Sequence, residues 1–118
     1  MEVKKDTKIR VIRPSDVVWE EAAKGPEETE APGDVFTAFT SPDAKFTTGY
    51  WQREVQRRDF VRPYHEIAYI IEGNVTLTLE DGEVIEAGPG DIVITPNGSK
   101  AHWHSTSRVR KFWAIYED

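Results

Sequence analysis

The segment Tyr64–Ser99, YHEIAYIIEGNVTLTLEDGEVIEAGPGDIVITPNGS, determines the fold class. Apolar runs of strand length (IAYII, VTLTL, DIVIT) alternate in it with glycine-bearing turns (GN, DGE, GPG, PNG). Turn signals at such short intervals leave no room for helices, so the segment predicts a meander of short antiparallel strands. The function then depends on the side chains that line the space enclosed by these strands.

Length, cysteine content and charge limit the classes of protein that need to be considered. The 118 residues suffice for one hydrophobic core, and without cysteine the chain has no disulfide, thiolate metal site or cysteine nucleophile. A net charge of -6 argues against nucleic acid as a partner, because phosphate contacts need a basic face. The chain has neither a signal-peptide core nor a membrane-spanning apolar run, so we expect a cytoplasmic protein without a membrane partner.

Further strands are predicted on both sides of the meander, which brings the total to about nine. The expected strands are 8–13, 35–40, 45–56, 60–71, 75–80, 83–87, 91–95, 101–105 and 109–117. Ser15 or Asp16 is placed to cap one helical turn through 17–24, and the acidic segment 25–34 is typical of a loop. We therefore expect residues 1–34, as strand, helical turn and loop, to pack on a barrel formed by residues 35–118.

The charged run RRDF, Arg57–Phe60, interrupts the apolar pattern. It contains two cations and one carboxylate in four residues, which is typical of a solvated turn. Alternatively, the arginines of this run could bind a phosphate group or another anionic substrate.

Two further spacings carry a resemblance to a known family. Glu66 stands seven residues before Gly73, and Gly90 stands six residues before Pro96, with Gly98 two further on. These spacings resemble the two motifs of the cupins, whose fold is a double-stranded β-helix, or jelly-roll barrel. The stretches TTGYWQRE, YHEIAYIIEG, AGPGDIVITPNGS and RKFWAIYE look like the small single-domain cupins of ethanolamine utilisation and the related cupin domains of ureidoglycine-type enzymes. The resemblance implies an all-β jelly-roll barrel, but this fold hosts many unrelated chemistries.

The family's metal ligands are mostly missing from this chain. Metal-binding cupins carry two histidines, six and four residues before the motif glutamate, and a third three residues after the PxG glycine. Those positions hold Phe60, Arg62 and Ala101, so only Glu66 of the usual four ligands is present. The resemblance with this departure implies no metal and no other cofactor.

Two histidines elsewhere keep a metal-dependent alternative open. His102 and His104, at i and i+2, share one face of a strand, and with Glu66 they could hold iron, manganese or zinc. The resemblance places position 101 inward, and alternation then turns both histidines outward. His65 is outward by the same rule if Glu66 faces the interior. A one-residue bulge would reverse the orientation of the pair.

Alternation and the resemblance together predict a ligand site in the barrel. The predicted ligand-binding residues are Trp51, Arg62, Tyr64, Glu66 and Trp103. Burial of the Glu66 carboxyl group would raise its pKa and make it a proton donor, whereas Arg62 would keep it ionised and able to bind an ammonium group. Both indoles, and a Glu66–Arg62 ion pair, are also compatible with a plain structural core.

We therefore expect a metal-independent cupin of the ethanolamine-utilisation type that binds a small polar or amine ligand. The alternative is a small enzyme of the same fold with Glu66 and Tyr64 as catalytic residues; a filled cavity would instead indicate a purely structural protein. Family members have been connected with acetate-kinase-like activity, but this chain has no glycine-rich phosphate loop, so that activity is not predicted. The C-terminal run RKFWAIYED is apolar on both faces, and the family expectation is a homodimer through such sheets.

Overall fold

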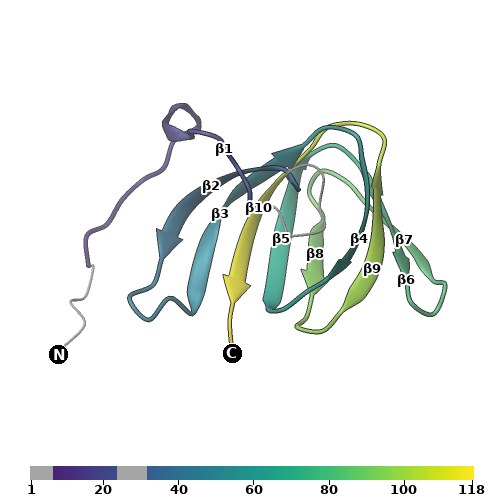
Figure 1. The fold of residues 1–118 in the computed structure, drawn as a ribbon. Helices are drawn as coiled ribbons and strands as arrows, with labels where there is room; N and C mark the ends of the chain where they lie inside the picture. The colour runs from purple at the N-terminus through teal and green to yellow at the C-terminus, as the bar shows by residue number, and fades with distance from the viewer. Residues whose placement is uncertain (1–6, 24–31) are drawn as a thin grey trace.

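The structure is a computed structural model and describes residues 7–23 and 32–118. These residues form ten strands and one short 3-10 turn, without any α-helix (Figure 1). The elements are η1 (Pro14–Asp16), β1 (Glu20–Glu21), β2 (Asp34–Thr40), β3 (Phe46–Arg53), β4 (Gln56–Val61), β5 (His65–Glu72), β6 (Val75–Leu79), β7 (Val84–Ala87), β8 (Ile92–Thr95), β9 (Lys100–Ser105) and β10 (Val109–Tyr116). No helix in the described ranges is long and apolar enough to cross a membrane.

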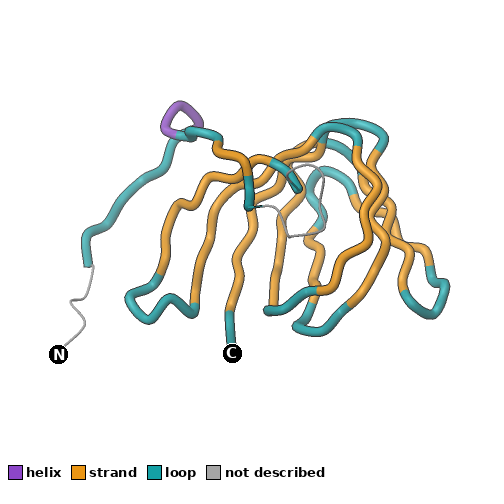
Figure 2. Tube along the Cα trace, in the orientation of Figure 1, coloured by secondary structure: helices purple, strands orange, loops and turns teal. Residues whose placement is uncertain are grey.

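The strands form two antiparallel sheets that face each other (Figures 1 and 2). The larger sheet has the order β1-β2-β3-β10-β5-β8, and the smaller one has the order β4-β9-β6-β7. The chain passes from one sheet to the other after β3, β4, β5, β7, β8 and β9. This repeated crossing is the jelly-roll arrangement, and the all-β fold predicted from the sequence is confirmed, with ten strands instead of nine.

The core lies between the two sheets, because alternate residues of each central strand point inward. On β5 the exposed and buried positions alternate along almost its whole length, as expected for a strand with one face on a core. The buried apolar cluster consists of Ile70, Val75, Leu77, Ala87, Trp103 and Val109. The interior toward the other end of the sheets is lined by charged and aromatic side chains instead, and it forms the candidate site.

Gly73, in the turn between β5 and β6, shows why the motif spacing depends on glycine. Its φ of 85° lies in the left-handed region, and a Cβ atom there would collide with the carbonyl oxygen of Arg108. Only glycine combines that backbone conformation with so close an approach of a neighbouring segment. The tight turn predicted at Glu72–Asn74 is therefore formed, and it fixes where β5 ends.

The N-terminal part of the chain differs from its prediction. Residues 8–13 form no strand in the described structure, and the side chain of Ile9 is 93% exposed. Helical geometry is confined to η1, where Pro14 occupies the first position and the Asp16 carboxylate accepts a hydrogen bond from the Arg13 amide at 2.8 Å. The predicted helical turn through 17–24 is wrong, since β1 lies within it; most of the predicted acidic loop lies outside the described residues.

The charged turn predicted at Arg57–Phe60 is also wrong, because these residues belong to β4. β4 pairs with β9 along its whole length, and its side chains alternate between inner and outer positions. Arg57 and Asp59 point outward, whereas Arg58 and Phe60 point inward. Because its outward residues are polar, β4 does not show the apolar pattern of a strand in the sequence. Pairing with β9 outweighs the local preference of these residues for a turn.

Candidate functional site

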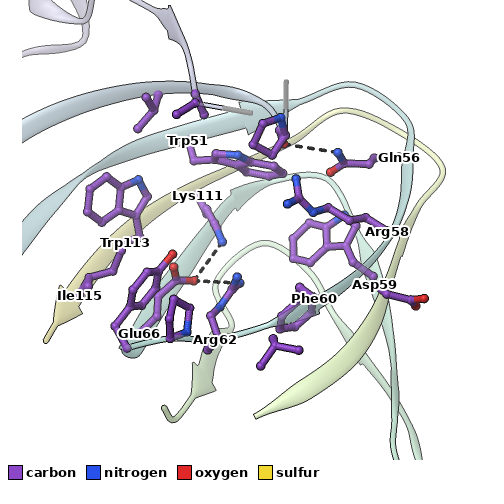
Figure 3. Close-up of a pocket in the computed structure, with 18 of the residues that line it drawn as sticks. Trp51, Gln56, Arg58, Asp59, Phe60, Arg62, Glu66, Lys111, Trp113 and Ile115 are labelled. Atoms are coloured by element: carbon purple, nitrogen blue, oxygen red, sulfur yellow. Dashed lines mark hydrogen bonds and ion pairs between the residues drawn. The ribbon is translucent and has the colours of Figure 1, made fainter. Parts of the chain in front are cut away.

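A cavity of about 580 Å³ opens between the two sheets (Figure 3). Its walls come from β2, β3, β4, β5, β9 and β10, from the segment between β4 and β5, and from Ala22, Ala23 and Pro32. All five residues predicted for the ligand site line it: Trp51, Arg62, Tyr64, Glu66 and Trp103. The structure therefore brings the predicted residues together, and their roles in binding or catalysis stay a prediction.

Glu66 is the central acidic group of the cavity. It is an inward residue of β5 and only 6% exposed. Its Oε2 atom accepts two hydrogen bonds, one from Lys111 Nζ at 3.0 Å and one from Arg62 Nη2 at 3.4 Å (Figure 3). The expected contact of Glu66 with Arg62 is therefore present, and Lys111 is a second cation on the same carboxylate.

Lys111 is the functional residue that the sequence analysis missed. It lies on β10 between the buried residues Val109 and Trp113, and its side chain is 8% exposed. The ammonium group lies over the rings of Trp51 and Trp103, 5.0 and 5.4 Å from their centroids. Because β10 has apolar residues on both faces, alternation in the sequence does not show that Lys111 points inward.

Burial strongly disfavours the charged form of Lys111. It is the largest influence and lowers the pKa of Lys111 below its usual value of 10.5. The Glu66 carboxylate acts in the opposite direction, and the positive charge of Arg62 lowers the pKa further. Lys111 consequently loses its proton more easily than an exposed lysine does.

Arg62 follows β4 and is held in place by several contacts. Its backbone amide donates to the Ser99 carbonyl at 3.0 Å, and its carbonyl accepts from the Gly98 amide at 2.7 Å. The guanidinium Nε donates to Thr95 Oγ1 at 3.1 Å, and the group lies 4.2 Å from the centroid of the Phe60 ring. These contacts position the guanidinium before any ligand arrives.

Tyr64 places a hydroxyl group in the wall of the same cavity. Burial raises the pKa of Tyr64 above its usual value of 10.0, and the negative charge of Glu66 adds to the effect. The hydroxyl group therefore stays protonated at neutral pH and can donate a hydrogen bond. This favours a binding contact for Tyr64 over a role as a base.

The walls also carry several aromatic rings. Trp51 and Trp103 meet edge to face, with ring centroids 5.5 Å apart and an interplanar angle of 82°. Phe60 and Trp113 add further rings to the lining. Aromatic rings lower the local dielectric constant, which strengthens the electrostatic interactions of a charged group beside them.

The described residues that line the cavity carry an excess of positive charge. The inward cations are Arg58, Arg62 and Lys111, and the inward anion is Glu66. Asp59 also borders the cavity, but its carboxylate is 89% exposed and is directed to His102 on the outside. Three cations less one carboxylate give a formal charge of +2, or +1 when Lys111 is neutral.

The three histidines lie on the outside, away from Glu66. His102 Nδ1 pairs with Asp59 Oδ1 at 2.7 Å, and His65 Nε2 pairs with Asp118 Oδ2 at 3.0 Å. The described pairing of β9 with β4 and with β6 has no register shift, so the bulge that would turn His102 and His104 inward does not occur. Nowhere in residues 7–23 and 32–118 do three His, Cys, Asp or Glu side chains converge as a metal site requires.

The positions that hold metal in related cupins do not fit a metal here. Phe60 and Ala101 offer no donor atom, and Arg62 places a guanidinium group beside Glu66. The Lys111 ammonium group lies 3.0 Å from the same carboxylate. A cation would meet one ligand and two positive charges at this site, so we derive no chemistry through a bound metal.

The family model of the EutQ-like cupin domain matches residues 40–113. A curated relative, acetate kinase EutQ from Clostridioides difficile (strain 630), is 25% identical over 116 residues, which are 98% of this chain. The chain spans 64% of the length of that relative.

Two solved structures share the fold. The EutQ protein of Clostridium difficile has a TM-score of 0.77 at 20% identity and covers 97% of this chain and 92% of its own. A candidate ethanolamine utilization protein EutQ from Salmonella typhimurium LT2 has a TM-score of 0.75 at 23% identity, covering 92% of this chain and 85% of its own. At these identities the two structures bear on the fold alone.

Proposed function

This chain belongs to the EutQ-like cupin domain family, and from that premise we propose that it is a metal-independent binding cupin that holds a small anionic molecule in its barrel. The observation that carries the proposal is the positive charge of the cavity. Because Lys111 and Arg62 already neutralise Glu66, the remaining charge favours a carboxylate or a phosphate over an ammonium ion.

The cavity also limits the size and character of the ligand. Its volume of about 580 Å³ is that of a pocket for a small molecule, and its lining includes the aromatic rings of Trp51, Phe60, Tyr64, Trp103 and Trp113. Lys111 and Arg62 lie around Glu66, whereas Arg58 lies closer to Trp51 and Gln56 (Figure 3). We therefore propose a ligand with one anionic group and a short apolar or neutral part.

The name of the Clostridioides difficile relative suggests the first probe. That protein is called an acetate kinase, and acetate is a carboxylate of the kind that the cavity suits. Ethanolamine is the matched opposite, since it is of similar size and carries a positive charge instead. The two compounds therefore separate the anion proposal from the amine expectation formed on the sequence.

Isothermal titration calorimetry with acetate, phosphate and ethanolamine tests the proposal. We expect one of the anions to bind and ethanolamine to bind more weakly. Arg58→Gln should weaken anion binding by at least about tenfold, because a hydrogen bond to a charged group contributes about 1.5–3 kcal/mol. Arg57→Gln is the matched control, since Arg57 is adjacent in sequence but points outward. Tighter binding of ethanolamine than of any anion would refute the proposal.

Elemental analysis tests the metal-independent part of the proposal. We expect iron, manganese and zinc in the purified protein at far less than one equivalent. Anion binding should be unchanged after dialysis against a chelator. A stoichiometric metal that is lost on substitution of Glu66 would contradict our proposal.

We further propose that a second copy of the chain covers the outer face of the large sheet. The exposed apolar residues of this face are Phe46, Ile67, Tyr69, Ile71, Ile92, Ile94, Phe112 and Tyr116. The pairing register places them in continuous rows across β3, β10, β5 and β8. A twofold interface presents the same patch twice, so an apolar face with little charge is complementary to itself.

Sedimentation velocity tests the dimer. Ile94, which is 67% exposed on β8, is the residue to change, and Ile94→Arg should give a monomer. Val84→Arg is the matched control, because Val84 is 59% exposed on the other sheet and should leave the dimer intact. A wild-type chain that stays monomeric at high concentration would contradict this assignment.

A further inference from the structure

Lys111 combines three properties that a nucleophilic lysine needs. Its ammonium group is enclosed by the rings of Trp51 and Trp103, it borders the cavity, and a carboxylate lies 3.0 Å away. An amine in an apolar enclosure next to another cation is the environment that activates lysine toward carbonyl carbon. Arg62 supplies that neighbouring cation. Anion binding alone uses none of the reactivity of this amine.

Glu66 is placed to handle the protons of such a reaction. Its oxygen accepts a hydrogen bond from Lys111 Nζ, so it is within reach of the proton that Lys111 must lose before it can attack. The same carboxyl group can return the proton to a leaving hydroxyl group. The hydroxyl group of Tyr64 lines the cavity as a further donor.

We propose that Lys111 forms an imine with a small 2-oxo acid whose carboxylate is held by the arginines of the cavity. This inference rests on the proposed function, because it deepens the anion site into a covalent one. The 2-oxo acids fit since they carry a carboxylate next to an electrophilic carbonyl carbon.

The step balances without any oxidant or reductant. Lys111 gives a proton to Glu66, and its nitrogen then attacks the carbonyl carbon, so that a C–N bond forms while the C–O double bond becomes single. The oxygen takes up protons and leaves as water when the C–O bond breaks. The products are a protonated imine on Lys111 and one molecule of water. Glu66 and Tyr64 are the groups at hand for these proton transfers.

Other lysines in the described residues lack this environment. Lys100 has a side chain that is 54% exposed and lies 3.9 Å from Glu80 at the surface. Lys45 is exposed as well. They therefore serve as internal references, since any non-specific reaction with a carbonyl compound modifies them first.

Borohydride trapping of the full chain with pyruvate, followed by peptide mass spectrometry, tests the proposal. We expect one carboxyethyl group on the Lys111 peptide, formed at neutral pH faster than on Lys100, since the lowered pKa of Lys111 raises the deprotonated fraction of this enclosed amine. The site is located in the wild-type protein, so the result does not depend on a variant that folds. Glu66→Gln, which keeps the lysine, should slow trapping, and Lys100→Arg should not.

The outcomes separate the two proposals. Calorimetric binding of pyruvate without any adduct on Lys111 would overturn the imine and leave the anion site standing. The absence of both binding and adduct would overturn the imine, and it would overturn the proposed function as well if acetate and phosphate also failed to bind. Equal labelling of Lys100, Lys45 and Lys111 would show ordinary surface chemistry and would also refute the inference.

Discussion

The inner and outer faces of β5 and β10 distribute their residues in an unexpected way. In a sheet with one face on a core, apolar side chains usually point inward and charged ones outward. Here Glu66 and Lys111 are buried on the inner face, whereas Ile67, Tyr69 and Phe112 are exposed on the outer face. The inner face therefore holds charge away from water, whereas the outer face exposes apolar side chains to it.

The two faces also differ in the change in free energy when their side chains are removed from water. Burying the outer apolar residues would contribute to stability roughly in proportion to the area covered. Burying the inner charges is costly unless each one is paired, and a pair of this kind often adds little net stability. A gain in stability therefore does not by itself account for the Glu66–Lys111 pair.

The largest expected effect on stability comes from breaking the Glu66–Lys111 ion pair. Lys111→Met should lower the free energy of unfolding by about 3–5 kcal/mol, because it leaves the Glu66 carboxylate buried with one partner fewer. Glu66→Gln should also destabilise, and the double variant should lose less than the sum of the two. Urea unfolding of the two single variants and the double variant measures this coupling. Strict additivity would show that the two groups do not interact in solution.

The next effect compares neighbouring residues on opposite faces of β5. Ile70 is fully buried and Ile67 is 51% exposed, so the same change to alanine can be made on each face. Ile70→Ala should cost about 2–5 kcal/mol through the cavity it leaves, and Ile67→Ala less than about 1 kcal/mol. Both are best measured in the Ile94→Arg background, where no second copy is expected. Equal losses would mean that the outer face already packs within the monomer.

Alkaline pH gives a smaller effect that belongs to the inner face alone. Because the pKa of Lys111 is lowered on folding, the unfolded chain binds more protons than the folded one in a window ending near 10.5. The free energy of unfolding should therefore rise with pH there, relative to Lys111→Met, by at most about 1.4 kcal/mol per pH unit. Tyr64 opposes this only above pH 10, since its pKa is raised on folding. A difference between the two proteins that falls with pH would contradict the stated environment of Lys111.

The smallest effect is expected from a histidine on the outside. His102→Ala removes a surface contact to Asp59 and no group that faces the cavity. Stability should change by less than about 0.5 kcal/mol, and the binding of anions should be unaffected. Thermal unfolding and the same calorimetric titration measure both. A large loss of binding would place His102 in the site after all.

The sequence was sufficient where a family motif fixed which face of a strand is inner. Glu66 was placed inward by its position in the cupin motif, and the structure places it on the buried face of β5 with Ala68 and Ile70. The resemblance placed position 101 inward, and alternation then put Trp103 inside and its two flanking histidines outside, as the structure has them. The turn spacing predicted short antiparallel strands, and the resemblance added the jelly-roll arrangement.

Lys111 and β4 were missed for opposite reasons. β10 has large apolar residues on both faces, so its hydrophobic pattern does not tell which face is inner, and Lys111 looked like one more polar residue near the start. β4 has charged or polar residues on both faces, so it had no apolar period at all. In both strands the orientation depends on pairing with distant segments, which no local pattern contains.

The ion pair between β5 and β10 has a consequence for how the sheet assembles. Because β10 carries Phe112 and Tyr116 on one face and Trp113 and Ile115 on the other, a slip of one residue would still bury aromatic surface. Such a slip would expel Lys111 and leave the Glu66 charge stranded without it, which is far costlier than the loss of packing. The Glu66–Lys111 pair therefore favours the native register of β5 and β10 during folding, since only this register brings both charges together.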